Sequence, residues 1–134
     1  MDHKFTFIAL GAVFWVLGVL IMHTFAPMLM DGGWVQVLWY AANFAYVPFA
    51  LILLAKATGR TKHDMLVPSV IILLTAQLMD GIAVSTDTLG LTTIYADSPL
   101  LAGQVGGFLL FAFWSVMAVA LYWHRPSATA AAAR

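Results

Sequence analysis

Four long apolar stretches constrain what this chain can fold into more than any other feature. They cover about residues 5–25, 34–57, 65–88 and 100–123. A helix needs about 20 apolar residues to cross a hydrocarbon core about 30 Å thick, and backbone groups in lipid must be hydrogen-bonded within the chain. The sequence therefore predicts an all-α fold, a four-helix transmembrane bundle that forms one domain over residues 1–125. Residues 126–134 are expected to be a short flexible tail.

The composition supports lipid as the environment of this chain. Hydrophobic residues make up 63% of the sequence and charged residues only 9%, whereas soluble domains have about 45–50% and about 25%. The first apolar stretch exceeds the h-region of about 7–15 residues in a signal peptide, so we expect it to be retained. A net charge of zero without a basic block argues against nucleic acid as a partner.

The basic residues predict the orientation of the bundle. Lys and Arg collect in cytoplasmic loops, and here they occur only at the two ends of the chain and in the second connection. The first and third connections contain Asp31, Asp87 and Asp97 but no basic residue. Both termini and the second connection should therefore be cytoplasmic. The six basic residues are Lys4, Lys56, Arg60, Lys62, Arg125 and Arg134.

Asp80 is an acid inside the third apolar stretch. It lies about 8 residues, or about 12 Å, from the predicted outer end of that helix. Ionisable residues within membrane spans are rare, and they often mark ion or proton pathways. Asp80 is therefore a candidate proton or cation site. The alternative is a structural acid that forms hydrogen bonds with Asn43 or Gln77 and fixes helix packing.

Other polar residues fall at a similar depth in the outer half of each span. Asn43 is level with Asp80, Tyr40 lies one turn above Asn43, and Gln77 lies one turn below Asp80. The inner halves are almost entirely apolar. We predict a polar vestibule that is open to the outside, with six ion- or ligand-binding side chains: Asp80, Asn43, Gln77, Gln104, Tyr40 and His23.

Small residues and a proline predict where the helices pack. Gly103 and Gly107 form a small-xxx-small pattern, which permits a close crossing within the bundle or between protomers. Gly81 follows Asp80 and permits a similarly close approach. Pro48 lies inside the second span and frees the carbonyl of Phe44, so a kink is expected there.

The sequence gives no support for catalysis, a metal or a cofactor. Asp80 and Asp87 are two turns apart on one helix, about 10 Å, which is too far for a pair of catalytic carboxylates. The serines in the spans have no histidine at matching depth. The His and Asp residues are dispersed without the spacing of metal ligands, and there are no cysteines to bind a metal ion. No histidine lies at mid-membrane, where it could hold a haem. We expect no enzyme activity, no metal and no cofactor.

Two segments carry a resemblance to known proteins. The stretch VPSVIILLTAQLMDGIAVSTDTLGLTTIYA, followed by GGFLLFAFWSVMAVALYW, resembles uncharacterised families of small four-helix bacterial integral membrane proteins. The resemblance covers the second half of the chain and implies a multi-pass protein of the bacterial inner (plasma) membrane, with no activity to carry over. The chain lacks the first-helix Glu of small multidrug-resistance carriers and the Asn and Phe motifs of fluoride channels.

Two classes of function follow from these patterns. In the first, the protein is a small proton- or cation-linked carrier or channel that acts as an oligomer through Asp80. In the second, it is a non-catalytic accessory or scaffold subunit of a larger membrane complex, and the polar residues stabilise helix packing. A chain of 134 residues offers little room for a translocation path of its own. A homodimer or a larger assembly is therefore expected in both cases.

Overall fold

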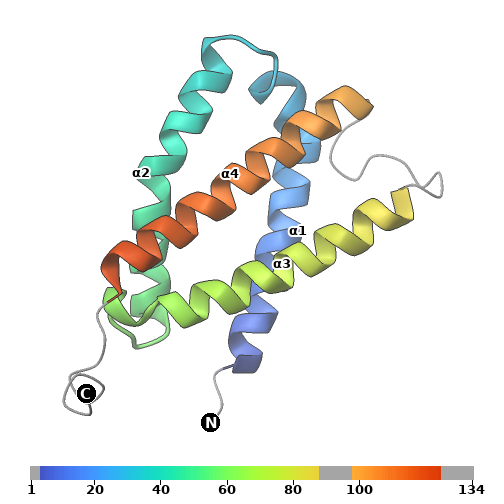
Figure 1. The fold of residues 1–134 in the computed structure, drawn as a ribbon. Coiled ribbons are helices and arrows are strands. Elements are labelled where there is room, and N and C mark those ends of the chain that lie inside the picture. The colour runs from blue at the N-terminus through green and yellow to red at the C-terminus, as the bar shows by residue number, and fades with distance from the viewer. Residues whose placement is uncertain (1–3, 88–97, 125–134) are drawn as a thin grey trace.

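The fold is built from four long α-helices. A computed structural model describes residues 4–87 and 98–124, and all regular structure in these ranges is helical. The helices are α1 (Lys4–Leu29), α2 (Trp34–Ala57), α3 (Leu66–Asp87) and α4 (Pro99–Trp123), with a short 3₁₀ turn, η1 (Lys62–Asp64), before α3 (Figure 1). All four are long and apolar enough to cross a membrane. The all-α fold with four apolar spans is therefore confirmed, and the predicted tail at 126–134 lies outside the described residues.

The helix ends differ from the predicted spans mainly in α1. This helix continues through Pro27 to Leu29, whereas the hydropathy pattern placed its end near residue 25. A proline in the last turns removes one backbone hydrogen bond without stopping the helix. At the start of α4, the Ser98 hydroxyl accepts a hydrogen bond from the Leu101 amide at 3.2 Å, and Pro99 takes the first helical position. Pro48 lies within α2, which is helical on both sides of it.

The helices pack mainly with partners that are not their neighbours in sequence. α1 packs most extensively against α3, α2 packs against α4, and α3 also contacts α4. α1 and α2 make few contacts with each other, although a short connection joins them. Figure 1 shows the 58–65 connection at the same end of the bundle as the start of α1 and the end of α4, and the α1–α2 connection at the opposite end. The described basic residues therefore gather at one end.

A close helix contact lies between α1 and α3 at Gly11. A Cβ atom at this position would come within 2.7 Å of both the Ile72 carbonyl oxygen and the Thr75 Cβ. At the predicted packing glycines, Gly81, Gly103 and Gly107, a Cβ atom would meet nothing within 4 Å. The expected crossing within the bundle is therefore not found at these three glycines. A role for them between protomers stays a prediction.

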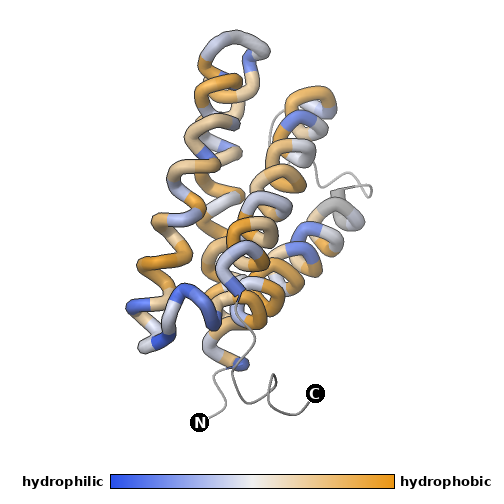
Figure 2. The backbone as a smooth tube through the Cα atoms, turned by 60° about the vertical axis from the view of Figure 1, so that its left-hand side comes forward, coloured by the Kyte–Doolittle hydropathy of each residue, from blue (hydrophilic) through white to orange (hydrophobic). Residues whose placement is uncertain are grey.

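Much of the apolar surface of the helices faces outward. On α3, Leu74, Leu78 and Ile82 follow at four-residue intervals with 58–66% of each side chain exposed. The opposite face of the same helix, which includes Ile72 and Ala76, is buried. Figure 2 shows hydrophobic colour along the helices and hydrophilic colour gathered in the 58–65 connection. Exposed apolar faces of this extent are typical of contact with lipid rather than with water.

Candidate functional site

A cavity of about 240 Å³ lies among the four helices. Residues of all four helices line it, and nearly all of them are apolar. A cavity of about 150 Å³ lined by aliphatic and aromatic side chains is large enough to hold benzene. This cavity therefore has room for a small organic molecule with a mainly apolar body.

Asp80 lies at the edge of this cavity and is bonded to α1. The Trp15 indole Nε1 donates a hydrogen bond of 2.6 Å to the Asp80 Oδ1, and both side chains line the cavity. Trp15 is about 11 residues, or about 16 Å, beyond the first residue of α1. The carboxyl group of Asp80 is thus beside the middle of α1 and not near its outer end. Figure 1 shows the reason, because α3 is strongly inclined to α1.

Trp15 was not among the predicted site residues. The signal that could have identified it is its position, since Trp usually lies at the ends of membrane spans and its N–H needs a partner when buried. Trp15 is in the middle of its apolar stretch. A mid-span indole N–H indicates an acceptor on a neighbouring helix, and Asp80 is that acceptor here.

Ser69 is the second polar group that lines the cavity from α3. Its side chain is 1% exposed, and its hydroxyl has no hydrogen-bond partner. The Thr75 and Ser115 hydroxyls, also in apolar surroundings, donate to the carbonyls of Ile71 and Phe111 four residues earlier, at 2.9 Å each. Such back-bonding is the usual solution in membrane helices. The Ser69 hydroxyl does not use it and is enclosed by the surrounding side chains.

Ser69 and Asp80 lie on the same face of α3, three turns apart. At 1.5 Å per residue their Cα atoms are separated by about 16 Å along the helix. Ile72, Leu73 and Ala76 line the cavity between them. The cavity wall on α3 is therefore apolar between these two residues.

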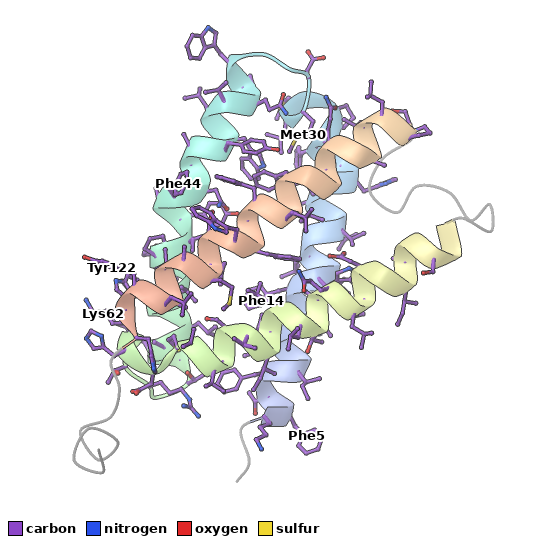
Figure 3. The ribbon with its side chains drawn as sticks, in the orientation of Figure 1. Phe5, Phe14, Met30, Phe44, Lys62 and Tyr122 are labelled. Atoms are coloured by element: carbon purple, nitrogen blue, oxygen red, sulfur yellow. The ribbon has the colours of Figure 1, made fainter. Side chains whose placement is uncertain are left out.

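The cavity is bounded on one side by exposed side chains of α1 and α2. Phe14, Tyr46 and Ala50 are the exposed members of the lining, and all three lie well inside their helices, away from the ends. Phe14 is labelled in Figure 3. The remaining lining residues are buried or half-buried. The exposed members of the lining therefore lie at mid-helix and not at either end of the bundle.

Asn43 does not line this cavity, although it lies at the depth predicted from the sequence. Its side chain is fully buried, and neither its Oδ1 nor its Nδ2 has a hydrogen-bond partner. The indole N–H of Trp39, one turn away on α2, also lacks a partner. Tyr40 packs with its ring centroid 5.1 Å from that of Phe108 and 5.0 Å from that of Phe111. These side chains form an aromatic contact between α2 and α4, away from Asp80.

Gln77, Gln104 and His23 are also absent from the cavity lining. Gln77 and His23 are exposed, and Gln104 is half-buried. Three residues advance a helix by about 300°, so Gln77 lies about 60° around α3 from Asp80. Of the six predicted site residues, the structure thus places Asp80 alone at the cavity. The described residues do not gather the six into one vestibule.

The 58–65 connection closes the end of the bundle that carries the basic residues. His63 Nδ1 lies 2.7 Å from the Trp123 carbonyl oxygen, so this nitrogen donates to the end of α4. The Lys62 ammonium lies 5.5 Å from the Trp123 ring centroid. The Thr61 hydroxyl donates to the Asp64 carboxylate at 2.6 Å, and this bond lowers the pKa of Asp64 below its ordinary value. Asp64 is fully exposed.

Metal binding finds no support in residues 4–87 and 98–124, where no group of three His, Cys, Asp or Glu side chains is placed to hold an ion. The chain was also compared with known proteins. No protein-family model, no curated protein and no solved structure matches it.

Proposed function

We propose that the protein is a small carrier of the inner (plasma) membrane, with cytoplasmic termini, in which Asp80 is the proton- or cation-binding group. The observation that carries this proposal is the position of the Asp80 carboxyl group, which lines a cavity shared by all four helices and is held by Trp15. The gathering of basic residues at one end of the bundle supports the cytoplasmic assignment of that end.

The lining of the cavity favours a carrier over an ion channel. A water-filled ion path needs polar groups along its length to replace the hydration shell of the ion. The lining residues between Ser69 and Asp80 are apolar, so a hydrated inorganic ion would lose its water without compensation. An apolar solute, or a proton carried on Asp80, meets no such barrier.

Trp15 is expected to orient the carboxyl group in this function. Its indole N–H donates to one oxygen of Asp80 and holds the side chain toward α1. A carboxylate keeps its charge when it accepts a hydrogen bond, so in this proposal Asp80 attracts a cation through that charge. Protonation of Asp80 removes that charge and weakens both interactions.

Proton flux into liposomes tests this proposal. The purified protein is reconstituted with a pH-sensitive dye inside the vesicles, and a potassium gradient with valinomycin drives the flux. Wild-type protein should acidify the lumen at least tenfold faster than the Asp80→Asn variant, while Asp31→Asn, in the exposed α1–α2 connection, should behave as wild type. Equal rates for the wild-type protein, Asp80→Asn and empty vesicles would contradict the proposal.

The second candidate function is an accessory subunit of a larger membrane complex. The observation in its favour is the open face of α4, where Gly103 and Gly107 are exposed and have no neighbour within 4 Å of a Cβ atom. Small residues four apart permit close approach of a second membrane helix. Native mass spectrometry of wild-type protein and Gly103→Leu, in mild detergent, tests this function. A larger assembly that is lost in Gly103→Leu, together with no Asp80-dependent flux, would favour it over the carrier.

A further inference from the structure

The end of the bundle that contains the 58–65 connection carries an excess of positive charge. Lys4 begins α1 there, and Lys56 lies in the last turn of α2. Arg60 and Lys62 lie in the connection itself. Of the described residues at this end, Asp64 is the one acid, so four positive charges are set against one negative charge. Lys4, Lys56, Arg60 and Lys62 together form the basic end of the bundle.

The local fold holds Arg60 beside α1. Gly59 has a φ of 66°, and its amide donates to the Lys56 carbonyl at 3.2 Å. The Arg60 amide donates to the Ala55 carbonyl at 2.8 Å, so α2 ends in the two-bond Schellman pattern. The guanidinium carbon of Arg60 lies 5.3 Å from the centroid of the Phe7 ring, and this ring is buried. Arg60 is therefore positioned both by its own backbone and by α1.

Aromatic rings are partners of both cations in this connection. The Lys62 ammonium lies 5.5 Å from the centroid of the Trp123 ring, and Arg60 has its own ring on α1. A ring attracts a cation through its π face, but it offers no oxygen to the N–H donors of an ammonium or guanidinium group. Arg60 also acts on the Asp64 carboxylate through its charge, yet one carboxylate offsets only one of the four positive charges. Cations of this kind bind phosphate and carboxylate oxygens most strongly.

The surface around the basic end is apolar. Phe5, which follows Lys4, is 79% exposed, and Tyr122 in the last turn of α4 is 86% exposed. Val67, in the first turn of α3, is exposed as well. Phe5, Lys62 and Tyr122 are labelled in Figure 3. Exposed apolar side chains at the end of a membrane span contact lipid, so an anion that binds here fits best when it is attached to apolar chains.

We infer that the basic end binds the headgroups of anionic phospholipids, with phosphate oxygens at Arg60 and Lys62 and acyl chains along the exposed apolar side chains. Clusters of Lys and Arg next to membrane spans attract anionic lipid in this way. The inference goes beyond the proposed carrier function, because it assigns a second interaction that does not involve Asp80. The two proposals share only the placement of this end at the membrane surface.

Spin-labelled lipids test this inference on the full chain in phosphatidylcholine bilayers. Phosphatidylglycerol and phosphatidylcholine carry the same label on one acyl chain, and electron paramagnetic resonance measures the fraction of each that is immobilised at the protein surface. The ratio of their association constants should favour phosphatidylglycerol about two- to fivefold at about 0.01 M salt. At about 1 M salt, where charges are screened over about 3 Å, the ratio should fall close to one. Inorganic phosphate at matched ionic strength should leave the ratio unchanged.

Substitutions at the basic end should change this ratio in both directions. Arg60→Gln removes one positive charge and should lower the preference for phosphatidylglycerol by about half, while Arg60→Lys keeps the charge and should retain the preference. Combining Arg60→Gln with Lys56→Gln and Lys62→Gln should bring the ratio close to one. Asp64→Asn removes the acid at this end and should raise the preference. Asp80→Asn, which tests the carrier, should leave the ratio unchanged.

Circular dichroism and size-exclusion chromatography show whether each variant folds. If the triple variant does not fold, the single substitutions and the salt dependence of the wild-type protein still decide the outcome. Equal association of the two lipids with the wild-type protein, a preference that persists at high salt, or a preference that Arg60→Gln leaves intact would overturn the inference. Loss of the preference on addition of inorganic phosphate would also overturn it, because the ligand would then be a free anion. None of these outcomes depends on proton flux, so the carrier function stands or falls separately.

Discussion

Replacement of Gly11 by alanine should separate α1 from α3. The added Cβ atom would lie 2.7 Å from a backbone oxygen, that of Ile72, and 2.7 Å from the Cβ of Thr75. Neither atom is the end of a flexible side chain, so the helices themselves must move apart. Overpacking of this kind costs about 1–3 kcal/mol, while alanine in place of glycine within a helix contributes about 0.5–1 kcal/mol of stability. We expect a net loss of about 0.5–2 kcal/mol.

Gly18→Ala provides a matched control in the same helix. A Cβ atom at Gly18 meets nothing within 4 Å, so only the gain in helix propensity remains and the free energy of unfolding should rise slightly. Unfolding is followed by circular dichroism as SDS is added to the protein in mixed micelles. The difference between the two variants should be about 1–3 kcal/mol. Equal stability of Gly11→Ala and Gly18→Ala would refute the close α1–α3 contact.

Two further substitutions test individual hydrogen bonds. Trp15→Phe removes the donor to Asp80 and should lower the free energy of unfolding by about 1.5–3 kcal/mol, as for a bond to a charged group. Trp114→Phe, at an exposed position, should lower the free energy of unfolding much less. Equal losses for the two variants in the same SDS titration would argue against the bond. Thr61→Val should raise the pKa of Asp64 toward its ordinary value, because the Thr61 hydroxyl is the main cause of its lowering. Since the lowered pKa belongs to the folded state, its small stabilising effect is present at neutral pH and is lost as the pH falls through that pKa. An unchanged Asp64 pKa in Thr61→Val, measured by ¹³C NMR of labelled aspartate, would contradict this cause.

The sequence predicts the helices better than it predicts their contacts. Span positions follow from the length of each apolar stretch, and the structure agrees with them to within a few residues for α2, α3 and α4. Each span is apolar all around, so the period of the pattern does not distinguish the bundle interior from the lipid face. On α3, for example, Leu73 is buried and Leu74 is 60% exposed. Tertiary packing, and not hydrophobicity, determines which face is buried.

The same limit explains the outcome for the predicted site. Depth along a helix can be counted from its ends, and the sequence places Asn43 and Asp80 at the same level on that basis. Direction around the helix and choice of partner helix cannot be counted in this way. α3 packs chiefly with α1 and α2 with α4, so Asp80 bonds to Trp15 while Asn43 is buried outside the cavity lining.

The glycine predictions illustrate a related difficulty. A small-xxx-small pattern identifies residues that permit a close crossing, but it does not say whether a partner helix is present. Gly103 and Gly107 match the pattern and have open space beside them, whereas Gly11, which this pattern does not identify, makes the close contact with α3. Only the packed structure distinguishes the two situations.

The most direct test of the central claim observes the Asp80 carboxyl group itself. ¹³C-labelled aspartate reports on every acidic side chain, because the chain has six acidic residues and all of them are aspartate; the Asp80→Asn variant assigns the signal of Asp80. In lipid bilayers, a decrease in pH should shift the Asp80 carboxyl signal as the group takes up a proton. An Asp80 signal that does not respond to pH would contradict its role as the proton-binding group.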